Sequence, residues 1–140
     1  MMAYPFPSEE WLRVLVEVLN SDERYAEVAK KWEGDMTVVI EPEDGDERQD
    51  LPVAVYLDLW HGKCRSSRFI DLEEEELPDS AFTLRSRIGN IEQLFSGKLD
   101  PIQAMMTRRL RVEGNMAYML RNVPTVLDFV RCCQKVPIKD

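Results

Sequence analysis

The chain has 140 residues, of which 44% are apolar and 31% are charged, a composition typical of a globular domain. A chain of this length buries about 68% of the surface of its unfolded state, so we expect one domain, residues 1–140, that folds without disulfides or metal. The sequence has no apolar run of membrane-spanning length, no basic signal-peptide start, and three cysteines without a CxxC pair. We therefore expect a cytoplasmic protein with reduced thiols.

The net charge of −8 is distributed unevenly along the chain. Residues 41–50 contain six acids and one arginine, and residues 71–79 contain six acids and no base, so we expect both segments to be solvated loops. Residues 95–135 instead contain seven Lys and Arg against three Asp and Glu. The overall acidity argues against nucleic acid as a partner, while the C-terminal third has the composition for a local basic face.

The first third of the chain has helical periodicity. Ser8 is a favourable N-cap, and apolar residues then recur at helical spacing as far as Asn20. A second helical stripe runs from Tyr25 to Trp32 and stops before Gly34. The middle of the chain is richer in β-branched residues and alternating patterns, which predict strands at residues 36–40, 53–60, 64–72 and 81–84, with a hairpin turn at residues 61–63.

The C-terminal third returns to helical patterns. A short helix precedes Asp100 and Pro101, which suit the N-cap and the first position of another helix. Residues 110–113 form a short strand, and Asn115 caps a last helix that Pro124 kinks or divides. The order of two helices, four strands, two helices, a strand and a helix predicts an α+β fold built on one sheet.

Candidate catalytic groups are few in this sequence. His61 is the single histidine, and the nearby Cys64 is a conceivable nucleophile for it, which keeps a small hydrolase or thiol enzyme as one alternative. No third residue is placed to orient such a pair. Metal-ligand spacings, phosphate-binding loops and dinucleotide fingerprints are absent from the sequence. We therefore expect no catalytic residues, no metal site and no cofactor.

The C-terminal segment has more apolar residues than one core-facing helix needs. Four of the seven methionines lie between residues 105 and 119, and the last helix has a second apolar stripe beside its first. Methionine is flexible and polarizable, so it suits surfaces that adapt to variable apolar shapes. The pattern fits ordinary core packing, a protein partner, or a ligand enclosed between helix and sheet.

Residues 95–119, FSGKLDPIQAMMTRRLRVEGNMAYM, resemble the sterol carrier protein 2 family, also called the sterol-transfer domain. The residues that match the family pattern are Gly97, Leu99, Asp100, Pro101, Ala104, Leu110, Val112 and Gly114. Two positions depart from it, since Arg108 stands where glycine is usual and Asn115 where aspartate is usual. The resemblance implies a twisted five-stranded sheet covered by helices, with an apolar tunnel that binds fatty acids, acyl-CoA or sterol-like lipids without catalysis, metal or cofactor.

From this resemblance and the apolar surplus we predict non-catalytic binding and transfer of a lipid in a cavity between the sheet and the C-terminal helices. The expected lining residues are Trp60, Phe82, Leu94, Phe95, Met105, Met106, Leu110, Met116, Met119, Leu120 and Leu127. The arginines expected either to be solvated or to contact a lipid headgroup or an anionic membrane are Arg108, Arg109, Arg111 and Arg121. The alternative function is a protein-interaction or accessory module in lipid or quinone metabolism. We expect a monomer or a homodimer.

Overall fold

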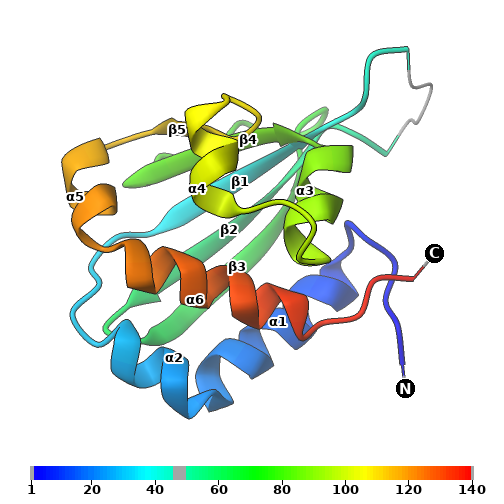
Figure 1. The fold of residues 1–140 in the computed structure, drawn as a ribbon. Coiled ribbons are helices and arrows are strands. Elements are labelled where there is room, and N and C mark those ends of the chain that lie inside the picture. Colours follow the sequence, from blue (N-terminus) through cyan, green and yellow to red (C-terminus); the bar gives the residue numbers. More distant parts are fainter. Residues whose placement is uncertain (1, 46–49, 140) are drawn as a thin grey trace.

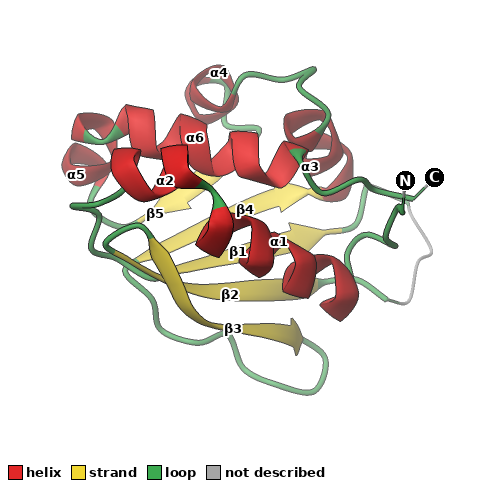
Figure 2. Ribbon diagram, turned by 90° about the horizontal axis from the view of Figure 1, so that it is seen from below, coloured by secondary structure: helices red, strands yellow, loops and turns green. Residues whose placement is uncertain are grey.

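The computed structural model describes residues 2–45 and 50–139, which form one sheet with a layer of helices on one face (Figures 1 and 2). In chain order the elements are α1 (Glu9–Ser21), α2 (Glu23–Val28), β1 (Met36–Glu41), β2 (Val53–Trp60), β3 (Lys63–Asp71), β4 (Phe82–Arg87), α3 (Ile88–Phe95), α4 (Pro101–Met106), β5 (Arg111–Glu113), α5 (Met116–Arg121) and α6 (Val123–Gln134). The predicted α+β fold on a single sheet is confirmed. Residues 46–49 of the expected first acidic loop lie outside the described residues.

Side-chain caps and proline set the helix boundaries that the sequence predicts. The Ser8 hydroxyl accepts a hydrogen bond from the backbone N–H of Trp11 at 3.1 Å, which caps the start of α1. The predicted break in the last helix separates α5 from α6 at Asn122. Pro124 lies in the first turn of α6, where its missing N–H removes no intrahelical bond.

Two element boundaries differ from the predictions. α2 ends at Val28 instead of continuing to Trp32, because the chain turns there and the indole of Trp32 packs beside Phe82, with ring centroids 5.3 Å apart. β4 continues to Arg87 because it pairs with β1 along the whole length of that strand. Long-range pairing therefore overrides the weak local signal at both places.

The sheet is open and mixed, with the strand order β3-β2-β1-β4-β5. β1 and β4 are parallel, whereas the other neighbouring strands are antiparallel. Successive side chains of β1 point to opposite faces. Met36 and Val38 point into the core beneath the helices, whereas Val39 packs on the other face with Ala54 and Ile70. One strand therefore contributes to both faces of the sheet.

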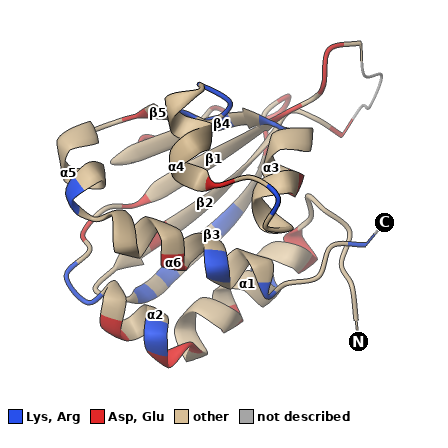
Figure 3. Cartoon of the chain, in the orientation of Figure 1, with Lys and Arg blue, Asp and Glu red and all other residues tan. Residues whose placement is uncertain are grey.

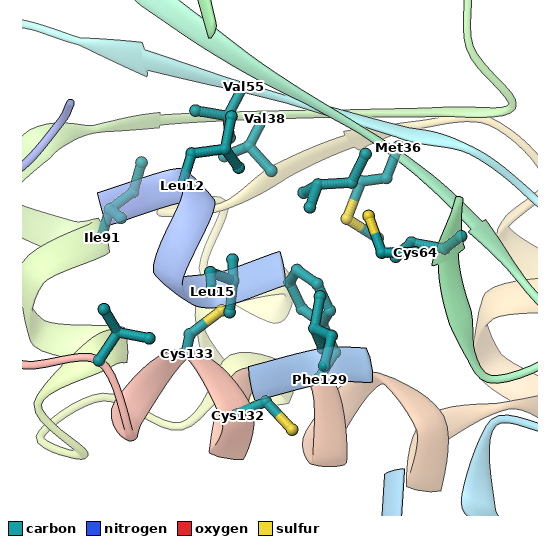
Figure 4. Packing of buried hydrophobic residues seen from close by; sticks show 14 of the residues in the cluster. Leu12, Leu15, Met36, Val38, Val55, Cys64, Ile91, Phe129, Cys132 and Cys133 are labelled. Carbon is teal, nitrogen blue, oxygen red and sulfur yellow. The ribbon is translucent and has the colours of Figure 1, made fainter. Parts of the chain in front are cut away.

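The main core lies between the sheet and helices α1, α3 and α6 (Figure 4). Figure 4 shows Leu12 of α1 beside Val55 of β2, and Leu15 of the same helix beside Cys133 of α6. Leu15 and Cys133 are at most 1% exposed. None of the helices in the described ranges has the length and apolar character that crossing a lipid bilayer requires.

The face of the sheet away from the helices is partly covered by the connection between β3 and β4. Leu72 and Leu77 of this connection pack against the cluster of Val39, Ala54 and Ile70. Toward β4 and β5 this face has a groove instead of a continuous cover. We refer to it below as the open face.

Candidate functional site

An apolar cavity of about 50 Å³ lies between the sheet and the C-terminal helices. Its floor includes Met36 and Val38 of β1 and Leu84 of β4, and its roof includes Ile91 of α3 and Phe129 of α6. Among the described residues that line it, none has a formal charge. The cavity therefore offers contact to apolar groups from every side.

The two hydroxyl-bearing residues in the lining do not make the cavity polar. The Thr125 hydroxyl donates a hydrogen bond to the carbonyl oxygen of Val28 at 3.2 Å. Burial raises the pKa of the Tyr25 phenol well above its usual range, so this group stays neutral at physiological pH. Neither residue offers a charge to a ligand.

The cavity is small for a ligand site. Ligand pockets typically have volumes of roughly 300–1,000 Å³, and one water molecule occupies about 30 Å³ in the liquid. The 50 Å³ found here matches less than two waters. A lipid chain could enter only if side chains or the short helices above the cavity moved aside.

Five of the eleven predicted lining residues meet around this cavity. They lie on α3, on α4, at the start of β5 and on α5, and they are Leu94, Phe95, Met105, Leu110 and Met119. Met119 is the most deeply placed, at 1% exposure. The residues between 94 and 119 that surround the motif thus form one continuous wall.

Four of the other predicted lining residues lie on the outer surface of α4, α5 and α6. Met106 is 81% exposed and Leu120 is 57% exposed, and Met116 and Leu127 are also exposed. The prediction expected Pro124 to kink or divide the helix after Asn115, but it continued one apolar stripe from Met116 to Val130 across that point. Because the helix is divided at Asn122, the apolar stripe of α5 does not continue in register into α6. The stripe of α6 that faces the cavity therefore does not include Leu127.

The remaining two predicted residues lie elsewhere in the fold. Trp60 is on the open face, because β2 alternates and its neighbour Leu59 occupies the cavity side. The Arg65 guanidinium lies 4.7 Å from the centre of the Trp60 ring. Phe82 is buried beside Trp32 at one end of the cavity, without lining it.

Sequence reasoning missed the lining residues that come from distant elements. On α6 these are Val126, Phe129 and Val130. On the sheet they include Met36 and Val38. The sequence predicted their strand, but it did not indicate which face of that strand the helices cover. The i, i+3, i+4 spacing of the α6 residues is the signal that could have found them, once the helix is divided at Asn122.

The residues of the family pattern build the wall between α3 and β5. Gly97, at φ +81°, ends α3, and the Asp100 carboxylate accepts a hydrogen bond from the backbone N–H of Ile102 at 3.4 Å to cap α4. Gly114 has φ +134°, and a Cβ there would lie 2.8 Å from the Phe82 ring. These residues therefore position the cavity wall without themselves presenting reactive groups.

The structure gives His61 and Cys64 different partners. His61 Nε2 lies 2.6 Å from Glu33 Oε2, whereas Cys64 Sγ donates to the Ser66 carbonyl oxygen at 3.3 Å. Burial raises the pKa of the Cys64 thiol to about 11, so the thiolate is scarce near neutral pH. Nothing in this arrangement activates Cys64 as a nucleophile.

A second group of titratable residues lies where α6 meets the start of α2. Ligand atoms of Asp22, Asp128 and Cys132 lie within 4.8 Å of one another. The two carboxylates are occupied by Arg131, at 2.6 Å from Asp22 and 2.7 Å from Asp128, while Lys135 also contacts Asp22 at 2.6 Å. Hydrogen bonds from Arg131 and Lys135 hold the pKa of Asp22 far below its usual range. This group is an ion-pair network between helices.

The predicted arginines separate into two places. Arg108, Arg109 and Arg111 line a groove on the open face near β4 and β5, whereas Arg121 is in the last turn of α5 and outside that groove. They do not form one continuous headgroup site at the cavity.

The fold and the cavity define a class: an α+β domain in which an open mixed sheet and one layer of helices enclose an apolar space. The model of the SCP-2 sterol transfer family matches residues 15–126, which is most of the chain, so the chain belongs to this family. The predicted family is thereby confirmed. No curated protein sequence matches the chain.

Solved structures agree with this assignment. A crystal structure of sterol carrier protein 2 is 25% identical, with a TM-score of 0.82 over 92% of this chain and 97% of that one. A conserved hypothetical protein of Thermus thermophilus, described as possibly a sterol carrier protein, is also 25% identical, with a TM-score of 0.81 over 94% and 90% of the two chains. The sterol carrier protein domain 2 of Helicoverpa armigera, at 16% identity and a TM-score of 0.61 over 94% and 90%, shares the fold.

Proposed function

We propose that the chain binds a lipid or another apolar ligand in the cavity between the sheet and helices α3 to α6, and that it holds and transfers this ligand without chemical change. Membership of the family supports lipid binding in general. The observation that supports this particular site is the apolar cavity, lined by Met105 and Met119 and free of charged groups among the described residues.

The energetics favour an apolar ligand once the site opens. Each buried CH₂ contributes about 0.8 kcal/mol, so a chain of about 16 carbons has a gross gain on the order of 13 kcal/mol. Ordering the ligand and losing its free translation offset much of that gain. The ligand must also displace side chains, and methionine has the rotamer freedom to move aside at low cost.

The route of access lies beside the short edge strand β5. A surface groove of about 440 Å³ runs along this strand, and Met105 and Leu110 line both the groove and the cavity. The two side chains therefore form the partition between the cavity and solvent. Movement of these side chains would join the two spaces.

The test is uptake of a fluorescent fatty acid, with native mass spectrometry of the purified protein to identify any lipid that it already holds. Met105→Gln places an amide in the partition at nearly constant volume. Because an unpaired buried amide costs about 1–3 kcal/mol, we expect uptake to weaken roughly tenfold. Met106→Gln is the matched control, since Met106 is 81% exposed, and we expect it to bind as the wild type does.

Two results would refute the proposal. The first is that the wild type takes up no fluorescent fatty acid and never contains lipid by mass. The second is that the two variants, both folded by circular dichroism, take up the probe equally well.

The exposed apolar side chains favour a second candidate function, that of an interaction module. Met106, Met116, Leu120 and Leu127 are all exposed on α4, α5 and α6, where a protein partner or a second copy would cover them. Light scattering at micromolar concentration measures this directly. A dimer that Leu120→Gln converts to a monomer would support it, and a monomeric wild type would leave the carrier as the better description.

A further inference from the structure

The open face has a large arginine-lined groove that the proposed function does not use. Its volume is about 680 Å³, and it lies over β1, β4 and the connection from α4 to β5. Its five cationic lining residues are Arg85, Arg87, Arg108, Arg109 and Arg111. Figure 3 shows blue segments at the end of β4 and between α4 and β5, in a chain whose net charge is −8.

The strand register concentrates these arginines on one face. Arg85 of β4 is directly opposite Arg111 of β5, and Val39 of β1 is beside Arg85 on its other side. Glu41 and Arg87 form the next row. Like charges directly opposite one another on a sheet are destabilising. The pairing of Arg85 with Arg111 therefore requires negative charge nearby, which Glu113 and Glu41 supply through ion pairs.

Carboxylates of the protein satisfy only part of this positive charge. Arg85 Nε lies 3.1 Å from Glu113 Oε1, and Arg87 Nη2 lies 3.0 Å from Asp44 Oδ2. A further ion pair joins Arg111 to Glu41. The side chains of Arg108 and Arg109 have no carboxylate partner among the described residues, and both residues line the same groove. The five arginines of the groove therefore face three partner carboxylates, Glu41, Asp44 and Glu113, which leaves a net of two positive charges.

The backbone at Arg108 supplies an independent observation. Its φ is +62°, a left-handed conformation that favours glycine. The chain therefore keeps a long cationic side chain where the backbone disfavours any side chain, and such local strain is typical of residues with a binding role.

We propose that this arginine groove binds the phosphate or diphosphate group of a small molecule. Arginine forms bidentate, charge-assisted hydrogen bonds with phosphate oxygens, and several arginines at one point suit a group with two or more negative charges. The rest of the molecule would rest on Val39 and Leu72, which line the same groove. The groove lies on the opposite face of the sheet from the apolar cavity, and phosphate binding there does not require that the cavity hold a lipid.

The surroundings restrict the ligand to a small anion. Glu41 and Asp44, which begin one acidic segment, and Leu72, which lies in the other, form part of the groove wall. The carboxylates of Glu41 and Asp44 in the wall disfavour the extended anionic surface of a membrane or a nucleic acid, whereas a single phosphate group can reach the arginines beside them.

The same phosphate chemistry has two sources. Arg85, Arg108 and Arg111 also line the groove along β5, whose inner wall is Met105 and Leu110. A phospholipid with its chain in the apolar cavity could therefore place its headgroup on these arginines. A soluble phosphate compound would use the open face alone.

The first experiment is a calorimetric titration with inorganic pyrophosphate at constant ionic strength. We expect a dissociation constant below about 1 mM. Amide NMR signals of Val39 and Leu72 on the open face should shift, while those of Leu59 and Ile91 at the cavity stay in place. Absence of binding at about 10 mM pyrophosphate would overturn the proposal, and it would leave fatty-acid uptake and the proposed function unaffected.

Arg108→Gly is the decisive variant, because glycine suits the backbone at φ +62° and folding is preserved. We expect pyrophosphate binding to weaken about tenfold, since a charge-assisted bond is lost. Arg109→Gln should act in the same direction. Arg13→Gln, which removes an exposed arginine of α1 outside the groove, should leave binding unchanged. Equal affinity in all four proteins would overturn the proposal.

Comparison of two ligands with the same headgroup identifies the source of the phosphate. Glycerol 3-phosphate has no chain, whereas a lysophosphatidic acid below its critical micelle concentration has one. Binding of the lipid about 100-fold more tightly, with the gain lost in Met105→Gln, supports the site as a headgroup site. Equal binding of both compounds supports it as a site for soluble phosphates. Failure of both to bind contradicts it.

Discussion

The two faces of β1 and β4 have opposite chemistry although the same strands form both. On the helix-covered face Val38 and Leu84 line a cavity of about 50 Å³. On the open face the neighbouring residues Val39 and Arg85 line a groove of about 680 Å³. Side chains nearly fill the space on the helix-covered face, whereas they leave a wide groove on the open face.

The physical reason lies in how each surface interacts with water. Apolar side chains gain free energy by removing one another from water, so a space between two apolar layers closes until close packing stops it. Charged guanidinium groups keep their hydration and repel one another, which holds a groove open.

The largest effect should come from enlarging the apolar cavity. Met119→Ala removes a side chain that is 1% exposed and leaves a larger hollow beside an existing one. We expect the free energy of unfolding to fall by about 4 kcal/mol. Urea denaturation measures the change, with the exposed Met106→Ala as a control expected within about 0.5 kcal/mol of the wild type. A similar loss in both variants would mean that the cavity wall is not packed as described.

The next largest loss of stability should come from removing Arg131, which is ion-paired, in contrast to Arg108 and Arg109 of the groove, which have no carboxylate partner among the described residues. Arg131→Met leaves Asp22 and Asp128 with fewer partners; the side chains of these two residues are 5% and 3% exposed. We expect a loss of about 3 kcal/mol at pH 7, at the lower end for a broken buried pair because Lys135 and Arg24 remain.

The pH dependence sharpens this prediction. The pKa of Asp22 is lowered in the folded state, mainly by Arg131, so its contribution to stability is complete above the unfolded-state value of 3.8 and is lost as the pH falls toward the lower folded-state value. The difference between wild type and Arg131→Met should therefore shrink between pH 5 and about pH 2. Urea denaturation at both pH values measures it, and a constant difference would contradict the role of Asp22.

Thiol labelling reports on the helix-covered face alone, because Cys64, Cys132 and Cys133 are all buried there. Burial raises the pKa of both Cys64 and Cys132 to about 11, against a reference value of 9.0. At pH 8 the folded protein should react about 100-fold more slowly than the denatured chain. Mass spectrometry of the labelled protein measures the rate. Rapid labelling of Cys64 would instead revive the thiol-enzyme alternative.

The smallest effect, and one of opposite sign, should come from Arg108→Gly on the open face. Glycine relieves the left-handed backbone strain at φ +62°, so the free energy of unfolding should rise by up to about 1 kcal/mol. Among the described residues, we expect this substitution to remove no side-chain hydrogen bond and no ion pair. Urea denaturation checks this result, and a clear destabilisation would mean that the Arg108 side chain holds the fold together.

Much of the fold was predictable because its signals are local. Ser8 and Asn115 act as helix caps through side-chain oxygens that reach only three residues along the chain. The alternation at residues 53–60 marks β2 in full. The cavity was harder to predict. Five of the eleven residues that were predicted to line it do so, and all five lie between residues 94 and 119, in or next to the segment with the family pattern.

The sequence by itself determined the caps, the strand alternation, the break at Pro124 and the placing of arginine in a glycine-favouring turn, since each depends on residues a few positions apart. Only the tertiary structure decided which face of β1 and β4 the helices cover, that Leu127 faces solvent, and that Arg85 stands opposite Arg111. These outcomes depend on the pairing and packing of segments distant in the chain, where the free energy of burial outweighs local preference.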